Sequence, residues 1–126
     1  MLVVVGAAGC GGPRTDDTDV QTVRYERLRE MLDREGTLLV DVRGAEAFAA
    51  GRLPKSVNVP FPAIRRRYGR LDDAGRIVVY GEDWRDPLPI AAAKRLIALG
   101  YDNVFEVKGG VELWTDSGGE LIRGED

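Results

Sequence analysis

The loop most suited to chemistry follows a short apolar segment and contains Gly81, Glu82, Asp83, Trp84, Arg85 and Asp86. It leads from an expected strand into an expected helix, and the free backbone N–H groups at a helix start ordinarily favour an anion. Three carboxylates here oppose one guanidinium. One carboxylate about 5 Å from an anion repels it by roughly 3 kcal/mol at an effective dielectric near 20, whereas the helix N-terminus contributes about 0.3–1 kcal/mol. We therefore expect the loop to disfavour small anions.

The residue types present exclude the commonest nucleophilic mechanisms. The sequence contains no histidine, so it lacks the usual general base and cannot assemble Cys–His or Ser–His–Asp catalysis. Its single cysteine, Cys10, excludes an internal disulfide and a thiolate–imidazole zinc site. Residues 81–87 contain no cysteine, serine, threonine or lysine, and no metal motif accompanies the aspartates for aspartyl-phosphate chemistry. We expect neither a metal nor a cofactor.

Structural roles can also account for the loop. Asp86 followed by Pro87 predicts an N-cap with proline in the first helical turn. Glu82 and Asp83 are expected to be solvated charges rather than ligands of a hard cation. Trp84 either packs over the mouth of a pocket or is exposed as an anchor for a partner, since tryptophan is frequent at binding hot spots.

Length and charge bound the possible functions. A chain of 126 residues fits one domain, and a net charge of −3 lacks the basic excess expected of a nucleic-acid-binding protein. The cluster Arg65–Arg67 with Arg70 is either a solvated helix face or a contact to phosphate head groups if the domain is tethered to a membrane. We expect a small molecule or a protein as the partner, and no nucleic acid.

Apolar segments alternate with helical patterns along the chain. Strands are expected at residues 37–41, 56–59, 76–80 and 103–107, and helices at residues 25–35, 45–50, 63–68 and 90–99. This alternation predicts an α/β fold with a central parallel sheet and helices on both faces. Ligands of such sheets bind beyond the carboxyl ends of the strands, so the segments after Val40, Tyr80 and Val107 are the candidate site.

The order and spacing of several short motifs resemble the rhodanese-like domain family. The motifs are Leu38–Arg43, Glu46–Pro54, Ser56–Pro60, Ile77–Tyr80, Ala91–Leu96, Leu99–Tyr101, Asn103–Val104 and Lys108–Trp114. In that family a cysteine after the strand that ends at Tyr80 carries the transferred sulfur as a persulfide, surrounded by backbone N–H groups of the loop. Gly81 stands there in this chain. The resemblance also implies that Asp41 and Arg43 hold neighbouring loops by charge-assisted hydrogen bonds and that Trp114 packs in the core.

The N-terminus predicts a separate segment. Residues 1–8 are mostly apolar and end in Ala7-Ala8-Gly9-Cys10, which resembles a bacterial lipoprotein signal with Cys10 as the lipidated residue. Residues 11–19 are small, polar and acidic, as in a flexible tether, so we expect the folded domain to span residues 20–126. The expected location is the cell envelope if this signal is real, and the cytoplasm otherwise.

Three functions remain open from the sequence. The first is a non-catalytic rhodanese-like domain that binds a protein or small molecule through residues 81–87, with or without a lipid anchor. The second is sulfur transfer by a non-standard route, for example with a cysteine borrowed from a partner chain. The third is a structural or vestigial domain within a larger assembly.

Overall fold

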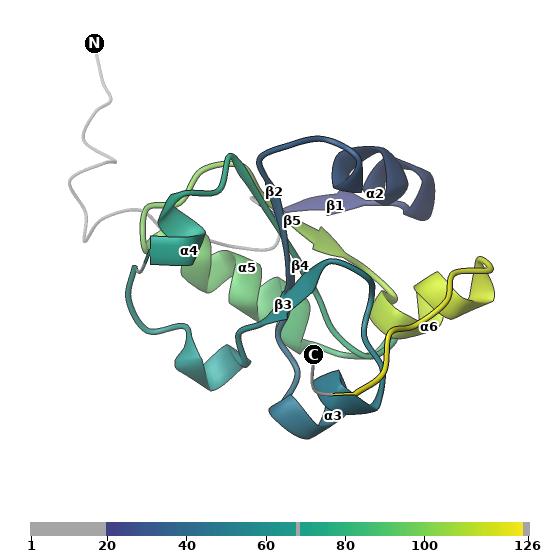
Figure 1. Cartoon of the computed structure of the whole chain (residues 1–126). Coiled ribbons are helices and arrows are strands. Elements are labelled where there is room, and N and C mark those ends of the chain that lie inside the picture. Colours follow the sequence, from purple (N-terminus) through teal and green to yellow (C-terminus); the bar gives the residue numbers. More distant parts are fainter. Residues whose placement is uncertain (1–19, 68, 125–126) are drawn as a thin grey trace, which may run out of the picture.

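The computed structural model describes residues 20–67 and 69–124, and its centre is a parallel β-sheet of five strands in the order β1-β5-β4-β2-β3 (Figure 1). In chain order the elements are β1 (Gln21–Val23), α2 (Tyr25–Leu32), β2 (Thr37–Asp41), α3 (Ala45–Ala50), β3 (Ser56–Asn58), the 3₁₀ helix η3 (Phe61–Ala63), α4 (Gly69–Asp72), β4 (Arg76–Tyr80), α5 (Leu88–Ala98), β5 (Val104–Val107) and α6 (Gly110–Asp116).

The central strands are buried on both faces, as their sequences predict. β4 lies between β2 and β5, with Val79 opposite Val40 on one side and Glu106 on the other. Val78, Val79 and Tyr80 have no exposed surface. Because the strands are parallel, their carboxyl ends meet at one edge of the sheet. The predicted α/β architecture is confirmed.

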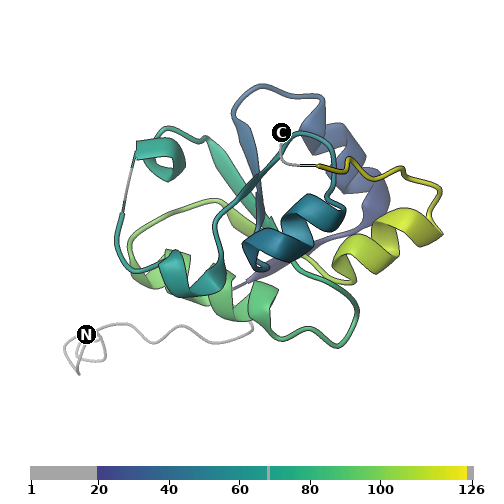
Figure 2. The ribbon, with the colours of Figure 1, turned by 60° about the horizontal axis from the view of Figure 1, so that its bottom comes forward.

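Helices cover both faces of the sheet and enclose two apolar clusters (Figure 2). One cluster lies between the sheet and α5, with Ile64 and Leu71 from the segment around α4 at its margin. The other lies beneath α2 and α6 and includes Leu28 and Trp114. Trp114 is 5% exposed and donates its indole N–H to the Glu120 carbonyl at 2.9 Å, so its expected place in the core is confirmed.

The prediction of a helix at residues 63–68 is wrong. The chain instead forms η3, turns at Ile64 (φ −83°, ψ 85°) and forms the four-residue helix α4 from Gly69. Ile64 and Leu71 are the buried apolar residues of this stretch, and the arginines between them are exposed. A helix at residues 63–68 would have no apolar face to bury. Tertiary packing would therefore not favour it over the observed turn.

Several boundaries also differ from expectation: β3 ends at Asn58 rather than residue 59, β5 begins at Val104 rather than residue 103, and α5 spans Leu88–Ala98 rather than residues 90–99. The first helix ends at Leu32 rather than residue 35, because the N–H groups of Asp33 and Arg34 bond to carbonyls of the last turn and Gly36 adopts a φ of +90°. The three-residue edge strand β1 was not predicted. It is too short to show clear alternation, and its pairing with β5 decides its conformation.

The C-terminal segment is attached through Arg52, which is 4% exposed. Arg52 forms an antiparallel bridge with Ile122 and donates from its guanidinium to the Gly124 carbonyl at 2.5 Å. Cys10 and the predicted tether lie outside the described residues. Among the helices of residues 20–67 and 69–124, none is long and apolar enough to cross a bilayer.

Candidate functional site

The loop of residues 81–87 follows β4 at the carboxyl edge of the sheet. The N–H of Val42, after β2, donates to the Tyr80 carbonyl at 3.1 Å, and the N–H of Val111, in α6, donates to the Gly81 carbonyl at 3.1 Å. The expected segments after β2, β4 and β5 therefore meet at this edge. Their convergence makes the loop the candidate site.

Asp86 connects the two ends of the loop with its carboxylate. Oδ2 accepts the N–H of Glu82 at 2.8 Å, and Oδ1 accepts the N–H of Leu88, the first residue of α5, at 2.9 Å. The second bond satisfies a free N–H of the helix start, which is the role expected of Asp86, although the helix begins one residue later than an Asp86 N-cap implies. The first bond reaches across the loop to the residue after Gly81.

The space beside Gly81 is filled by this carboxylate. A Cβ atom on residue 81 would overlap the carboxylate of Asp86 and lie 2.8 Å from Cγ of Pro89. Gly81 itself is buried. The loop in this conformation therefore accepts no side chain at position 81 unless Asp86 moves and the Pro89 ring shifts slightly.

Three further backbone donors of the loop have acceptors within the protein. The N–H of Arg85 donates to Asp83 Oδ1 at 2.9 Å, the N–H of Asp86 donates to the Asp83 carbonyl at 3.3 Å, and the N–H of Trp84 donates to Glu112 Oε1 at 3.5 Å. Two of these N–H groups, which could otherwise face an anion, are thus occupied by carboxylates of the loop and of α6, and the third by a backbone carbonyl.

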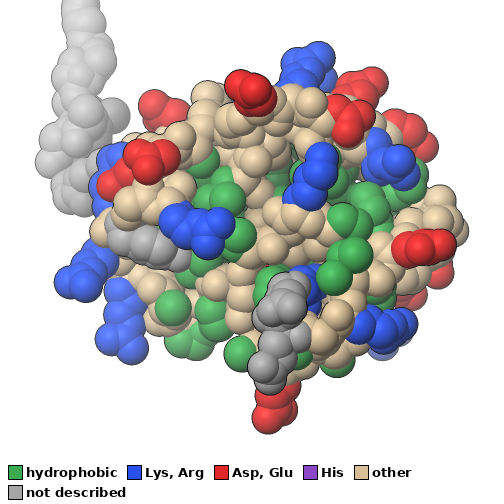
Figure 3. Space-filling view, viewed as in Figure 1, with side chains coloured by type: hydrophobic (Ala, Val, Ile, Leu, Met, Phe, Trp, Pro, Cys, Tyr) green, Lys and Arg blue, Asp and Glu red, His purple; other side chains and the backbone are tan. Residues whose placement is uncertain are grey.

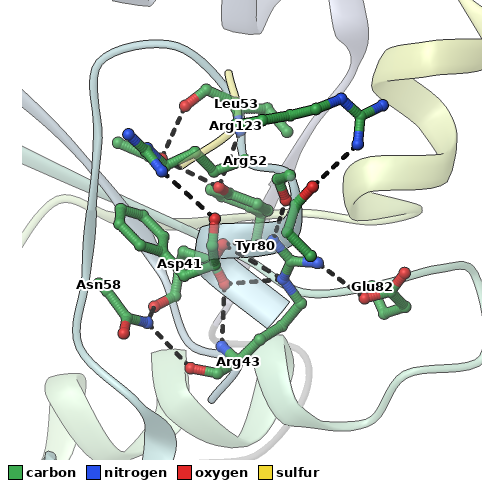
Figure 4. Close-up of polar contacts among 12 residues, drawn as sticks. Asp41, Arg43, Arg52, Leu53, Asn58, Tyr80, Glu82 and Arg123 are labelled. Carbon is green, nitrogen blue, oxygen red and sulfur yellow. Dashed lines mark hydrogen bonds and ion pairs between the residues drawn. The ribbon is translucent and has the colours of Figure 1, made fainter. Parts of the chain in front are cut away.

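Arg43 holds the loop from the side of β2 (Figure 4). Its guanidinium bonds to both carboxylate oxygens of Asp41 and donates to Glu82 Oε1 at 2.8 Å and to the Gly51 carbonyl at 2.6 Å. Burial by itself would lower the pKa of Arg43, but its bonds to Asp41 and Glu82 outweigh burial and raise that pKa further above its ordinary value. Arg43 therefore stays positively charged at any pH at which the protein is folded.

Glu82 corrects one expectation from the sequence. Its side chain is 55% exposed, as expected of a loop charge, but it is ion-paired to the buried Arg43 rather than solvated alone. Asp83 is partly buried and accepts the Arg85 N–H within its own turn. Among the described residues, no group of three or more histidine, cysteine, aspartate and glutamate side chains could hold a metal ion.

Sequence reasoning missed two positioning residues. The side-chain amide of Asn58 donates to the carbonyls of Asp41 at 3.0 Å and Arg43 at 2.9 Å, which fixes the chain at the end of β2. The buried hydroxyl of Tyr80 lies 3.0 Å from Ser56 Oγ and accepts the Leu53 N–H at 3.1 Å. For Tyr80 the sequence did offer a signal, because a tyrosine at the end of an apolar strand needs a hydrogen-bond partner for its buried hydroxyl.

Trp84 is 51% exposed and lies beside a groove on the α6 side of the loop. The groove has a volume of about 410 Å³ and is lined by Thr22, Val23, Arg24, Tyr25, Glu26, Trp84, Lys108, Leu113 and Ser117. A smaller pocket of about 190 Å³ borders Asp83 and Asp86, and Trp84 does not line it. Of the two expectations for Trp84, exposure fits the structure better than packing over the mouth of that smaller pocket.

Sequence comparison decides the family. The Rhodanese-like domain profile matches residues 25–117, which include strands β2 to β5, the loop and α6. The chain belongs to the rhodanese-like domain family. It is also 32% identical over 99 residues to the thiosulfate sulfurtransferase GlpE of Pseudomonas putida strain GB-1, an alignment that covers 77% of this chain and 86% of that protein.

Solved structures confirm the rhodanese-like fold. The BH2092 protein from Bacillus halodurans superposes with a TM-score of 0.74 at 24% identity, covering 86% of this chain and 80% of that chain. A thiosulfate sulfurtransferase from Pseudomonas aeruginosa superposes with a TM-score of 0.72 at 21% identity, covering 86% of this chain and 21% of that chain. At these identities the likeness concerns the fold alone.

Proposed function

We propose that this rhodanese-like domain is non-catalytic and acts as a binding or regulatory module through the loop of residues 81–87. The observation that carries the proposal is the carboxylate of Asp86, which fills the space beside Gly81 and accepts the Glu82 N–H. In sulfurtransferases of this family a cysteine is expected at the position of Gly81. Here the loop holds a carboxylate of its own where a sulfur group would be held.

The charges of the loop support the same proposal. A substrate such as thiosulfate is an anion, and the carboxylates of Asp83 and Asp86 border the pocket beside the loop. Glu106, which is 4% exposed, also lines that pocket. Lys108 is the one cation of its lining. An excess of carboxylates repels an incoming anion more strongly than one lysine attracts it.

Trp84 is the proposed contact to a partner. Its ring edge lies against Gly109, where a Cβ atom would approach Trp84 Cε2 to 2.7 Å, and half of the side chain remains open to solvent beside the groove. An aromatic side chain held by its neighbours loses little conformational entropy on binding. A Trp84→Ala variant that kept every partner interaction of the parent protein would contradict this part of the proposal.

The test of catalysis is sulfur transfer from thiosulfate to cyanide by three proteins: the parent chain, Gly81→Cys, and Gly81→Cys with Asp86→Ser. We expect no activity in the parent or in the single variant, because Asp86 blocks the new thiol. Serine keeps a short oxygen for the Leu88 N–H while vacating the space, so activity confined to the double variant is expected. Gly81→Ser with Asp86→Ser is the matched control without a thiol.

Three other outcomes would contradict parts of the proposal. Activity of the parent protein above the uncatalysed rate would contradict the non-catalytic proposal and support sulfur transfer by another route. Activity of Gly81→Cys alone, equal to that of the double variant, would mean that Asp86 does not obstruct position 81. Persulfide detected on the purified parent chain would likewise support an enzyme.

We also propose that Cys10 is a lipid attachment site and that the domain resides in the cell envelope. The support is the sequence Ala7-Ala8-Gly9-Cys10 followed by the polar, acidic residues 11–19. Mass spectrometry of the protein purified from bacterial membranes tests this directly. A chain that begins at an acylated Cys10 is expected, whereas an intact Met1 and a free thiol would contradict the proposal.

A further inference from the structure

Four arginines, Arg65, Arg66, Arg67 and Arg70, form an exposed arginine patch in the segment that leads into α4. Basic side chains gather over this segment in the space-filling view, at the left of the molecule (Figure 3). The whole chain carries a net charge of −3, so this concentration of positive charge is local. Adjacent like charges repel one another, and a fold does not need four of them in six positions.

The charges of the patch are only partly compensated within the domain. Arg67 pairs with Asp72 at 3.1 Å and its guanidinium lies 4.4 Å from the centre of the Tyr101 ring. Arg65 donates through Nε to the Pro62 carbonyl at 3.1 Å. This bond leaves the two terminal nitrogens of its guanidinium available to a ligand. Arg66 and Arg70 form no hydrogen bond or ion pair with another described residue. The patch thus presents an excess of positive charge to solvent.

Arg67 and Arg70 lie toward the edge of the sheet opposite the candidate site, beside Tyr101 and Thr37 respectively. α4 leads directly into β4 at Arg76, and β1 begins at Gln21, close to the first described residue. Because β1 and β4 run parallel in one sheet, their starting ends share an edge, and residues 81–87 lie at the other edge. Val20, the first described residue, therefore lies near the same edge as Arg67 and Arg70.

We propose that the arginine patch docks on the surface of an anionic lipid bilayer. Guanidinium groups bind lipid phosphates through charge-assisted hydrogen bonds, and basic residues near an anionic membrane are attracted by its surface potential. In this orientation the loop of residues 81–87 points away from the membrane toward soluble partners. The inference extends the proposed attachment at Cys10 but does not require it, because the charges act without an acyl chain.

The experiment measures co-sedimentation of the full chain, carrying Cys10→Ser so that no acyl group contributes, with two kinds of vesicle. One contains phosphatidylcholine alone, and the other is an equal mixture of phosphatidylcholine and phosphatidylglycerol. The patch variant is Arg65→Gln with Arg66→Gln and Arg70→Gln, which retains the Arg67–Asp72 pair. The control variant, Arg24→Gln with Arg27→Gln and Arg85→Gln, changes the net charge equally at exposed positions elsewhere.

We expect binding to the anionic vesicles only, with a partition coefficient about a hundredfold lower in the patch variant and reduced far less in the control. Binding should also weaken as ionic strength rises above about 0.15 M, because salt screens exposed charges. Equal losses in both variants would overturn the proposal in favour of a net-charge effect. Displacement by inorganic phosphate at constant ionic strength would also overturn it, since that result indicates a discrete phosphate site. Circular dichroism of both variants checks that they are folded.

Discussion

The carboxylate of Asp86 occupies the space that a side chain on residue 81 would need. It is held there from both sides, by the N–H of Glu82 at 2.8 Å and the N–H of Leu88 at 2.9 Å. The same side chain therefore begins helix α5 and fills the centre of the loop. A thiol introduced at position 81 alone would therefore meet the Asp86 carboxylate, because that space is already filled.

This relationship predicts a coupling between positions 81 and 86. Gly81→Cys should lower the free energy of unfolding by about 1–3 kcal/mol, the usual cost of overpacking a filled site. Asp86→Ser alone should cost about 0.5–2 kcal/mol through a weaker helix start. The double variant should be more stable than the sum of the two losses predicts, because serine relieves the overlap. Urea unfolding of the four proteins measures this, and additive losses would contradict the overlap.

The two tryptophans should differ strongly in solvent access. Trp84 is 51% exposed, whereas Trp114 is 5% exposed and bonded to the Glu120 carbonyl. Acrylamide should quench the fluorescence of a Trp114→Phe variant, which retains Trp84, several times more efficiently than that of Trp84→Phe. Similar quenching constants would mean that Trp84 is covered. Addition of a true partner should protect the emission of Trp84 and leave that of Trp114 unchanged.

The ion pairs of Arg43 should contribute unequally to stability. Arg43→Leu leaves the fully buried carboxylate of Asp41 without its guanidinium partner, and a loss of about 3–5 kcal/mol is expected. Glu82→Gln removes only a charge that is 55% exposed, so a loss of about 0–1 kcal/mol is expected. Thermal or urea unfolding of the two variants distinguishes these roles. Comparable losses of stability in the two variants would instead mean that Glu82, and not Asp41, is the principal partner of Arg43.

Tyr80 should make the protein sensitive to alkaline pH. Burial, and secondarily the negative charge of Asp41, raises the pKa of Tyr80 above its ordinary value. The unfolded chain loses this proton near pH 10 while the folded protein keeps it, so folding stability falls as pH rises above about 10, by up to about 1.4 kcal/mol per pH unit. Below that pH the group makes no pH-dependent contribution.

The matched variant for this titration is Tyr80→Phe. It should be less stable at neutral pH, because the Leu53 N–H loses its acceptor, yet its stability should decline less steeply above pH 10 than that of the parent protein. Urea unfolding at several alkaline pH values provides the comparison. Parallel slopes in the two proteins would show that Tyr80 ionises normally in the folded state.

Much of the architecture could be predicted from the sequence because it depends on local patterns. The apolar segments at Thr37–Asp41 and Arg76–Tyr80 specify strands buried on both faces, and the structure has these strands with the expected bounds. The helix at Ala45–Ala50 also has its expected bounds. The absence of histidine likewise follows from composition alone, and it limits the available chemistry whatever the fold.

Only the tertiary structure decided features that depend on distant neighbours. The turn at Ile64 and the edge strand β1 follow from packing and pairing with other segments, which local propensity does not contain. The pairing of Glu82 with Arg43 joins residues 39 positions apart, so no local pattern announces it. The sequence by itself determined that Gly81 stands at the end of a buried strand. That the carboxylate of Asp86 fills the place beside it depends on how the loop folds back on itself, which only the three-dimensional structure specifies.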